Sequence, residues 1–140
     1  MIRHSELRRK WVIRAEISAV EQICAELADW LAQQNLSEHR FALEILAREA
    51  LNNAILHGCE QNPSLQVQCE LDIRENELRL QITDEGTGFD WQSVLSRDIA
   101  SVEQDHGRGL YLYHLYADSV EFNASGNSIL LVRRRNFPIL

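Results

Sequence analysis

Three polar side chains recur every four residues inside an apolar helical pattern, and two of them are groups that take part in catalysis and metal binding. They are Glu49, Asn53 and His57. Residues four apart lie one above another on one face of an α-helix. A carboxylate there can accept a proton from an attacking group, and a carboxamide oxygen suits a hard metal ion. By itself, the line is equally typical of the solvated stripe of an amphipathic helix.

A second group of residues follows an alternating apolar pattern that is typical of a strand. Asp84 ends the pattern, and Gly86 and Gly88 come directly after it. Taken singly, an aspartate here is typical of a turn and the glycines of residues with positive φ. Together, a carboxylate fixed at a strand end can accept a hydrogen bond from the exocyclic amine of adenine, and guanine would be disfavoured. The two groups therefore suggest a nucleotide pocket in which Glu49 activates an attacking group, Asn53 holds a metal ion and Asp84 reads the base.

A third motif, Gly107-Arg108-Gly109-Leu110, is predicted to open a helix. Backbone amides at a helix N-terminus can bind phosphate oxygens, and Arg108 could add a bidentate contact. The motif is also typical of a hinge between a loop and a helix. It lacks the spacing and lysine of a P-loop, and it does not follow a strand as a dinucleotide-binding fingerprint would.

The hydrophobic periodicity predicts the elements that must position these residues. Strands are expected at 11–17, 65–73, 78–82, 120–122 and 128–135, and helices at 18–34, 37–58 and 107–117. Ser18 and Ser37 are expected as N-terminal caps, and Gly58 as a C-terminal glycine. Because the hairpin strands have one polar face, the helices should cover the other. The fold class predicted is a two-layer α/β sandwich with a mixed, mostly antiparallel sheet.

Composition places this chain of 140 residues among single globular domains, here 1–140, with 45% hydrophobic residues. The net charge of −7 argues against nucleic acid as a partner. Two basic runs, Arg8-Arg9-Lys10 and Arg133-Arg134-Arg135, are expected to be solvated. No signal peptide and no membrane-spanning segment are expected. The three cysteines, in no CxxC spacing, fit reduced thiols in the cytoplasm.

The three motifs resemble those of the GHKL ATPases, the superfamily of gyrase, the chaperone Hsp90, histidine kinases and MutL. The line from Glu49 to His57 resembles their N box, Asp84 to Gly88 their G1 box, and Gly107 to Leu110 their G2 box. The pattern Glu-Ala-x-x-Asn-Ala-x-x-His-Gly at 49–58 is most similar to the bacterial anti-sigma factor serine/threonine kinases. The resemblance runs from Trp11 to Arg135 and implies the Bergerat (GHKL) ATP-binding fold.

The resemblance also implies roles in phosphoryl transfer. Mg²⁺ would be held by Asn53 and the phosphates of ATP. Glu49 would lie near the γ-phosphate and accept the proton of a partner's serine or threonine hydroxyl. Histidine kinases commonly have asparagine in its place, so Glu49 favours the serine/threonine kinase branch.

The remaining motif residues would bind the nucleotide. Asp84 would bind adenine, and residues 90–106 would form a mobile ATP lid. Ser128 stands where the family often has threonine near adenine. The implied nucleotide-binding residues are Asn53, Asp84, Gly86, Gly88, Gly107, Arg108, Gly109, Leu110 and Ser128.

The partners implied by the resemblance are an anti-sigma factor antagonist of the STAS type, which would be phosphorylated, and a sigma factor or similar regulator, which would be sequestered. A homodimer is also implied. Trp11 and Trp30 could belong to its interface or to the core. Two other functions fit the same motifs, an ATP-dependent binding module without kinase activity and a simple GHKL ATPase.

Overall fold

A computed structural model of the chain describes residues 7–86 and 108–136. Its strands form one sheet in the order β1-β2-β3-β5-β4. The strands are β1 (Arg8–Arg14), β2 (Gln66–Ile73), β3 (Glu77–Asp84), β4 (Ser119–Phe122) and β5 (Ser128–Arg134). The four pairings between neighbouring strands are all antiparallel. The parallel component of the expected mixed sheet is therefore wrong for the described strands.

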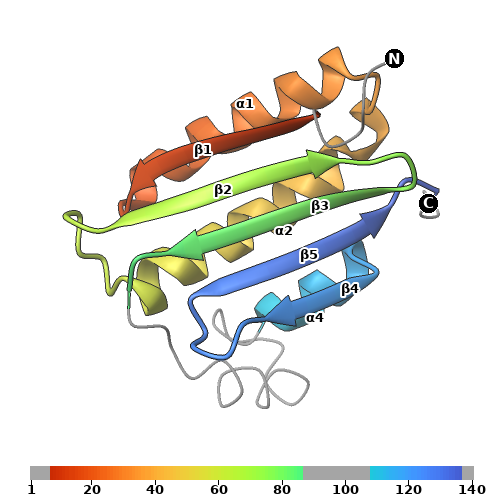
Figure 1. The fold of residues 1–140 in the computed structure, drawn as a ribbon. Helices are drawn as coiled ribbons and strands as arrows, with labels where there is room; N and C mark the ends of the chain where they lie inside the picture. Colours follow the sequence, from red (N-terminus) through yellow and green to blue (C-terminus); the bar gives the residue numbers. More distant parts are fainter. Residues whose placement is uncertain (1–6, 87–107, 137–140) are drawn as a thin grey trace.

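Three α-helices lie together on one face of this sheet, as Figure 1 shows. They are α1 (Val20–Gln33), α2 (Arg40–Asn53) and α4 (Arg108–Tyr116). Short 3-10 turns, η2 (Ile17–Ala19) and η3 (Ser37–His39), precede α1 and α2, and a π-helical turn, η4 (Ala54–Gly58), continues α2. The predicted two-layer α/β sandwich and its order of elements are confirmed. In the part of the chain that the structure describes, no helix is long and apolar enough to cross a bilayer.

Alternation along the central strands separates a buried face from a polar one. On β2 the inward side chains include Val67, Leu71 and Ile73, which are fully buried. On β3 the inward row is Leu78, Leu80, Ile82 and Asp84. Since side chains alternate between the two faces of a strand, Asp84 must point into the helical layer. The strand period itself thus places a carboxylate at the end of an apolar row.

Helix α2 faces the sheet with small side chains near its C-terminal end. Ala47, Ala50 and Ala54 are buried there, and Gly58 follows one turn later. Small residues let a helix approach a sheet closely and leave space between larger neighbours. In Figure 1 this end of α2 lies behind the end of β3 that carries Asp84.

The ends of the first elements differ from those predicted. Strand β1 ends at Arg14, and Ile17 opens the turn η2 with 45% of its surface exposed. Ser18 and Ser37 lie inside 3-10 turns, and the side-chain caps expected from them are not formed. In both turns a backbone hydrogen bond replaces the cap, from the Ala19 amide to the Glu16 carbonyl and from the His39 amide to the Leu36 carbonyl.

Trp11 and Trp30 belong to the core of the single chain. Trp11 and Trp30 are buried, and their rings meet edge to face with centroids 6.3 Å apart. Such pairs add about 0.5–1.5 kcal/mol beyond the burial of their area. A dimer interface would therefore have to use other residues.

The cysteines are buried and unpaired, as predicted for reduced thiols. Burial raises the pKa of Cys24 to about 11 and that of Cys69 to about 12. These two thiols therefore stay protonated at neutral pH and act as small apolar side chains.

Arg133 is buried, although the basic run that contains it was expected to be solvated. It occupies an inward position of β5, and its Nε donates to Nδ1 of buried His39 over 3.0 Å. Its Nη1 donates to the Tyr116 carbonyl over 2.8 Å. The guanidinium therefore joins β5, the start of α2 and the end of α4. The basic composition of the run predicts solvent exposure, but the alternation of side chains along β5 turns Arg133 into the core.

The buried contact between His39 and Arg133 should make stability depend on pH. Burial, together with the charge of Arg133, lowers the pKa of His39 below its ordinary 6.5. Unfolding then takes up a proton once the pH falls below about 6.5, so stability is retained above this pH and lost as the pH falls. We expect the free energy of unfolding to drop by at most about 1.4 kcal/mol per pH unit for this proton.

Denaturant titrations between pH 7.5 and 5 check this expectation. His39→Asn keeps an acceptor for Arg133 but does not titrate in this range, so its stability should depend less on pH. The matched control is His114→Asn, at an exposed histidine of α4. An equal pH dependence in wild type and His39→Asn would contradict the assignment.

Candidate nucleotide site

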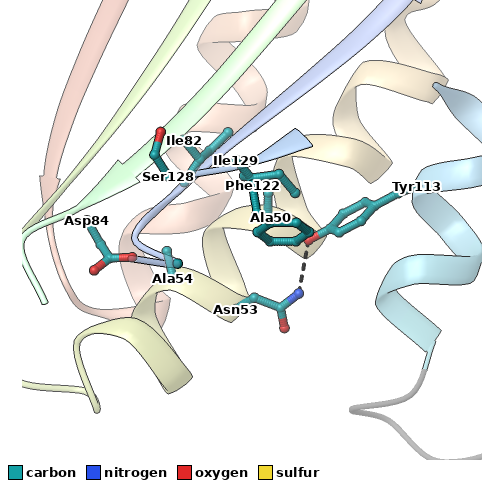
Figure 2. A pocket seen from close by; sticks show the side chains of 10 residues that line it. Ala50, Asn53, Ala54, Ile82, Asp84, Tyr113, Phe122, Ser128 and Ile129 are labelled. Carbon is teal, nitrogen blue, oxygen red and sulfur yellow. Dashed lines mark hydrogen bonds between the residues drawn. The ribbon is translucent and has the colours of Figure 1, made fainter. Parts of the chain in front are cut away.

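A cavity of about 20 Å³, within about 250 Å³ of empty space that includes open solvent, lies between the C-terminal end of α2, α4 and the edge formed by β3 and β5. Figure 2 shows its side chains. It is lined by Ala50, Asn53, Ala54, Ile82, Asp84, Tyr113, Phe122, Gly126, Ser128 and Ile129. Three of the predicted site residues, Asn53, Asp84 and Ser128, therefore share one cavity although they lie on a helix and two strands far apart in sequence. An apolar cavity with a few polar groups is the usual form of a ligand site.

Asp84 is the buried acid of the cavity, with only 5% of its surface exposed. The Gly86 amide donates to its Oδ1 over 2.8 Å. The backbone of Asp84 is fixed by the neighbouring turn, because its amide donates to the Asn127 carbonyl over 2.9 Å. Burial raises the pKa of Asp84, and the hydrogen bond from Gly86 partly opposes this. The carboxylate is thus an oriented acceptor that gains from a donor such as a purine amine.

Two glycines enclose this carboxylate. A Cβ at Gly58 would lie 2.4 Å from Oδ2 of Asp84, and a Cβ at Gly86 would lie 1.9 Å from the Gly58 carbonyl oxygen. Neither glycine has positive φ, so the usual reasons for glycine at such places, a left-handed C-terminal cap and a left-handed turn residue, do not apply here. Both positions need glycine because the helix end and the strand end approach so closely.

The helix end that makes this approach is widened. The Cys59 amide donates to the Ala54 carbonyl, five residues back, over 2.8 Å. Such π-helical turns occur frequently at functional sites. The predicted helix reaches Gly58 as expected, but its last turn is not α-helical.

Asn53 presents its carboxamide at the other side of the cavity. Its Nδ2 donates to the Tyr113 hydroxyl over 3.0 Å, and Figure 2 shows its oxygen on the side away from this ring. Amide oxygens are ligands that Mg²⁺ accepts, and Mg²⁺ usually keeps several waters and takes few protein ligands. The residue therefore fits the predicted metal ligand.

Glu49 is half-buried on α2, one turn before Asn53 and on the same face. Within the described residues it is not part of the cavity lining. His57 lies in the π-helical turn and is also half-buried. The structure thus brings Asn53 and Asp84 together directly and leaves Glu49 beside them.

Ser128 borders the cavity, but its hydroxyl points away from it (Figure 2). The hydroxyl lies 3.0 Å from that of Thr83 and accepts a hydrogen bond from Gln81 over 3.1 Å. Because Ile129 takes the inward position, strand alternation directs Ser128 to the outer face. A contact between its hydroxyl and a nucleotide would require the side chain to turn, and it stays a prediction.

The phosphate motif is described in part. Arg108 and Gly109 open α4, as predicted, and Leu110 is half-buried against the core. Gly88, Gly107 and the lid at 90–106 lie outside the described residues.

Tyr113 and Phe122 are cavity residues that the sequence reasoning missed. Leu110, Tyr113 and Ala117 recur at helical spacing on α4, which marks Tyr113 as an inward residue. Phe122 ends the predicted strand at 120–122. The hydrophobic periodicity could have predicted that Tyr113 and Phe122 point towards the core, but not that they line the cavity.

Comparison with known proteins agrees with this geometry. Residues 13–133 match the model of the histidine kinase-like ATPase domain. The chain belongs to this family. Membership in the histidine kinase-like ATPase family implies that the chain binds ATP.

Three relatives of this ATPase domain are anti-sigma factors or a kinase. The anti-sigma F factor of Shouchella clausii is 41% identical over 47 residues, 34% of this chain and 32% of that protein. The anti-sigma F factor of Clostridium beijerinckii is 26% identical over 96 residues, 66% of this chain and 67% of that protein. The serine-protein kinase RsbW of Bacillus subtilis is 27% identical over 103 residues, 67% of this chain and 64% of that protein. The matches thus span about a third of the first relative and about two thirds of the others.

Substituting Gly58 by alanine should disturb the ATPase-domain cavity although no polar side chain is replaced. The new Cβ would lie 2.4 Å from Oδ2 of Asp84, so the buried carboxylate or the helix end must move. Overpacking of this kind costs about 1–3 kcal/mol. We expect ATP affinity, measured by calorimetry, to fall about tenfold or more. Leu56→Ala, at an exposed residue of the same turn, is the control. Wild-type affinity in Gly58→Ala would show that Asp84 does not depend on this contact.

Asp84→Asn should separate stability from ATP binding. Because burial raises the pKa of Asp84, its charged form costs the folded state free energy at neutral pH, and the neutral amide removes this cost. The amide still accepts from Gly86 but presents a donor to adenine. We expect the free energy of unfolding to rise without nucleotide, while ATP affinity falls about tenfold or more. A variant that binds ATP as wild type does would refute the role of Asp84.

Proposed function

We propose that the chain is a serine/threonine protein kinase of the anti-sigma factor type. In this proposal it binds ATP with Mg²⁺, phosphorylates an anti-sigma factor antagonist of the STAS type, and sequesters a sigma factor or similar regulator. The observation that carries the proposal is the convergence of Asn53 and Asp84 in one cavity, with Glu49 one turn from Asn53.

Adenine binding follows from the surroundings of Asp84. Among the described residues, the buried carboxylate accepts a hydrogen bond from the Gly86 amide. A carboxylate has further lone pairs, so it can accept the exocyclic amine of adenine. Guanine would place a carbonyl oxygen against the same acceptor, which makes ATP the preferred nucleotide. Ala50, Ala54 and Ile82 supply the apolar walls for a flat ring.

The phosphates would extend from the base towards Asn53 and the start of α4. The amide oxygen of Asn53 would hold Mg²⁺, which neutralises charge on the phosphates when bound. The N-terminus of α4, which begins at Arg108, supplies a positive dipole end for phosphate oxygens. Most of the catalysis in phosphoryl transfer is positioning of this kind.

Glu49 would act on the acceptor hydroxyl. The serine or threonine oxygen of the partner forms the new bond to the γ-phosphorus, the bond to the β-phosphate oxygen breaks, and ADP leaves. The proton of the hydroxyl passes to the Glu49 carboxylate. General base catalysis typically contributes about 10²–10⁴-fold.

The relatives support the choice of partners, since two are anti-sigma F factors and one is a serine-protein kinase. Action on such regulators would place the protein in the cytoplasm, and we include a homodimer in the proposal. Because Trp11 and Trp30 are buried in the core, they are not available to a dimer interface, and other surfaces would have to form it.

One observation favours a second function, an ATP-dependent binding module without kinase activity. Glu49 lies beside the cavity and is not part of its lining among the described residues. A module of this kind would bind ATP through Asp84 and Asn53 in the same way, and nucleotide would change its affinity for a partner without phosphoryl transfer.

Phosphoryl transfer from labelled ATP to candidate STAS-type antagonists distinguishes the two functions. For a kinase, Glu49→Gln should lower the rate of transfer by about 10²–10⁴-fold, because the amide cannot take the proton, and leave ATP affinity close to wild type. Glu44→Gln, on the same helix, is the matched control and should transfer at the wild-type rate. Transfer that is undiminished in Glu49→Gln would refute Glu49 as the base. Partner binding that depends on ATP, with no transfer by wild type, would establish the binding module instead.

A further inference from the structure

We propose that Tyr113 is a positioning residue that holds the Asn53 carboxamide in the orientation needed to bind the metal. This inference rests on the proposed function, because it concerns the same Mg²⁺ ligand. It adds to the site a side chain that none of the three sequence motifs contains.

The contact joins two helices through a buried hydroxyl. Tyr113 is 1% exposed, and its oxygen lies 3.0 Å from Nδ2 of Asn53 (Figure 2). The two residues are separated by 60 positions, so the hydrogen bond depends on the packing of α4 against α2. Both residues also line the cavity. The hydroxyl is thus placed by the core and not by the local chain.

An asparagine needs such a partner to act as a metal ligand of fixed geometry. The terminal torsion of its side chain is broad, so a free amide would sample many orientations. Its two ends are chemically different, because the NH₂ group donates and only the oxygen can bind a cation. With Nδ2 engaged by Tyr113, the oxygen is held on the opposite side, away from the ring. In this arrangement the oxygen is the end of the amide that is offered to a cation.

The position of Tyr113 on α4 links this effect to the phosphates. Helix α4 begins at Arg108, in the motif predicted to bind phosphate, and Tyr113 lies on the same rigid helix. The hydrogen bond therefore fixes the distance between the metal ligand on α2 and the start of α4. We therefore expect Tyr113 to affect the binding of the nucleotide's metal complex more than the binding of its base.

Tyr113→Phe tests the proposal because it removes the hydroxyl and keeps the ring that fills the core. ATP affinity would be measured by calorimetry with Mg²⁺ and again with EDTA. We expect the variant to bind ATP about 3- to 10-fold more weakly with Mg²⁺, as for the loss of one hydrogen bond, and equally well with EDTA. Tyr111→Phe, at an exposed tyrosine of the same helix, is the matched control.

A double-mutant cycle with Asn53→Ala provides a second measurement. If Tyr113 acts through Asn53, Tyr113→Phe should have no further effect on Mg²⁺-dependent affinity once Asn53 is replaced. Equal losses with Mg²⁺ and with EDTA, or additive losses in the cycle, would show a merely structural role and overturn the inference. A wild-type protein that fails to bind ATP would overturn the proposed function together with it, whereas normal wild-type binding with an unaffected Tyr113→Phe would overturn only the role of Tyr113.

Discussion

The burial of one carboxylate against a glycine is the constraint on which the site depends. Asp84 takes an inward position of β3 after a row of apolar side chains, so it cannot reach solvent without breaking the strand register. Room for the carboxylate comes from two glycines, because a Cβ at Gly58 would lie 2.4 Å from its Oδ2 and a Cβ at Gly86 would lie 2.9 Å from its Oδ1. Because Gly58 ends the π-helical turn η4 that continues α2, this contact also fixes where Asn53 lies relative to the sheet. The cavity is the space that remains when these two elements meet through small side chains.

Binding and stability oppose each other at this point. A buried acid with a raised pKa costs the folded protein free energy, yet the same burial strengthens its hydrogen bond to a ligand. Functional sites often retain such unfavourable groups. The small residues of α2 act similarly, since Ala50 and Ala54 leave space where larger side chains would fill the core. The arrangement is what a site for a ligand with an apolar ring and a donor group requires.

The sequence predicted the fold class, most of the elements and a cavity shared by Asn53 and Asp84, because these follow from periodicity and from motif resemblance. Glu49, which was expected in the same pocket, is not part of the cavity lining among the described residues. It did not predict the buried Arg133, because the basic composition of the run indicates solvent exposure although the strand period turns Arg133 inward. The π-helical turn and the close contact that requires glycine at Gly58 also depend on the approach of a distant strand, β3. The contact of Ser128 with a nucleotide stays a prediction, and the strand period explains why its hydroxyl is turned to the outer face. Local patterns thus identify the inward face, whereas contacts between elements decide what each inward residue does.

The most direct test of the central claim is a crystal structure of the protein with a non-hydrolysable ATP analogue and Mn²⁺, whose anomalous signal locates the metal. The account predicts the adenine amine within hydrogen-bond distance of Asp84, the ring between α2 and β3, and the metal on the amide oxygen of Asn53. A nucleotide bound elsewhere, or a metal bound without Asn53, would contradict it.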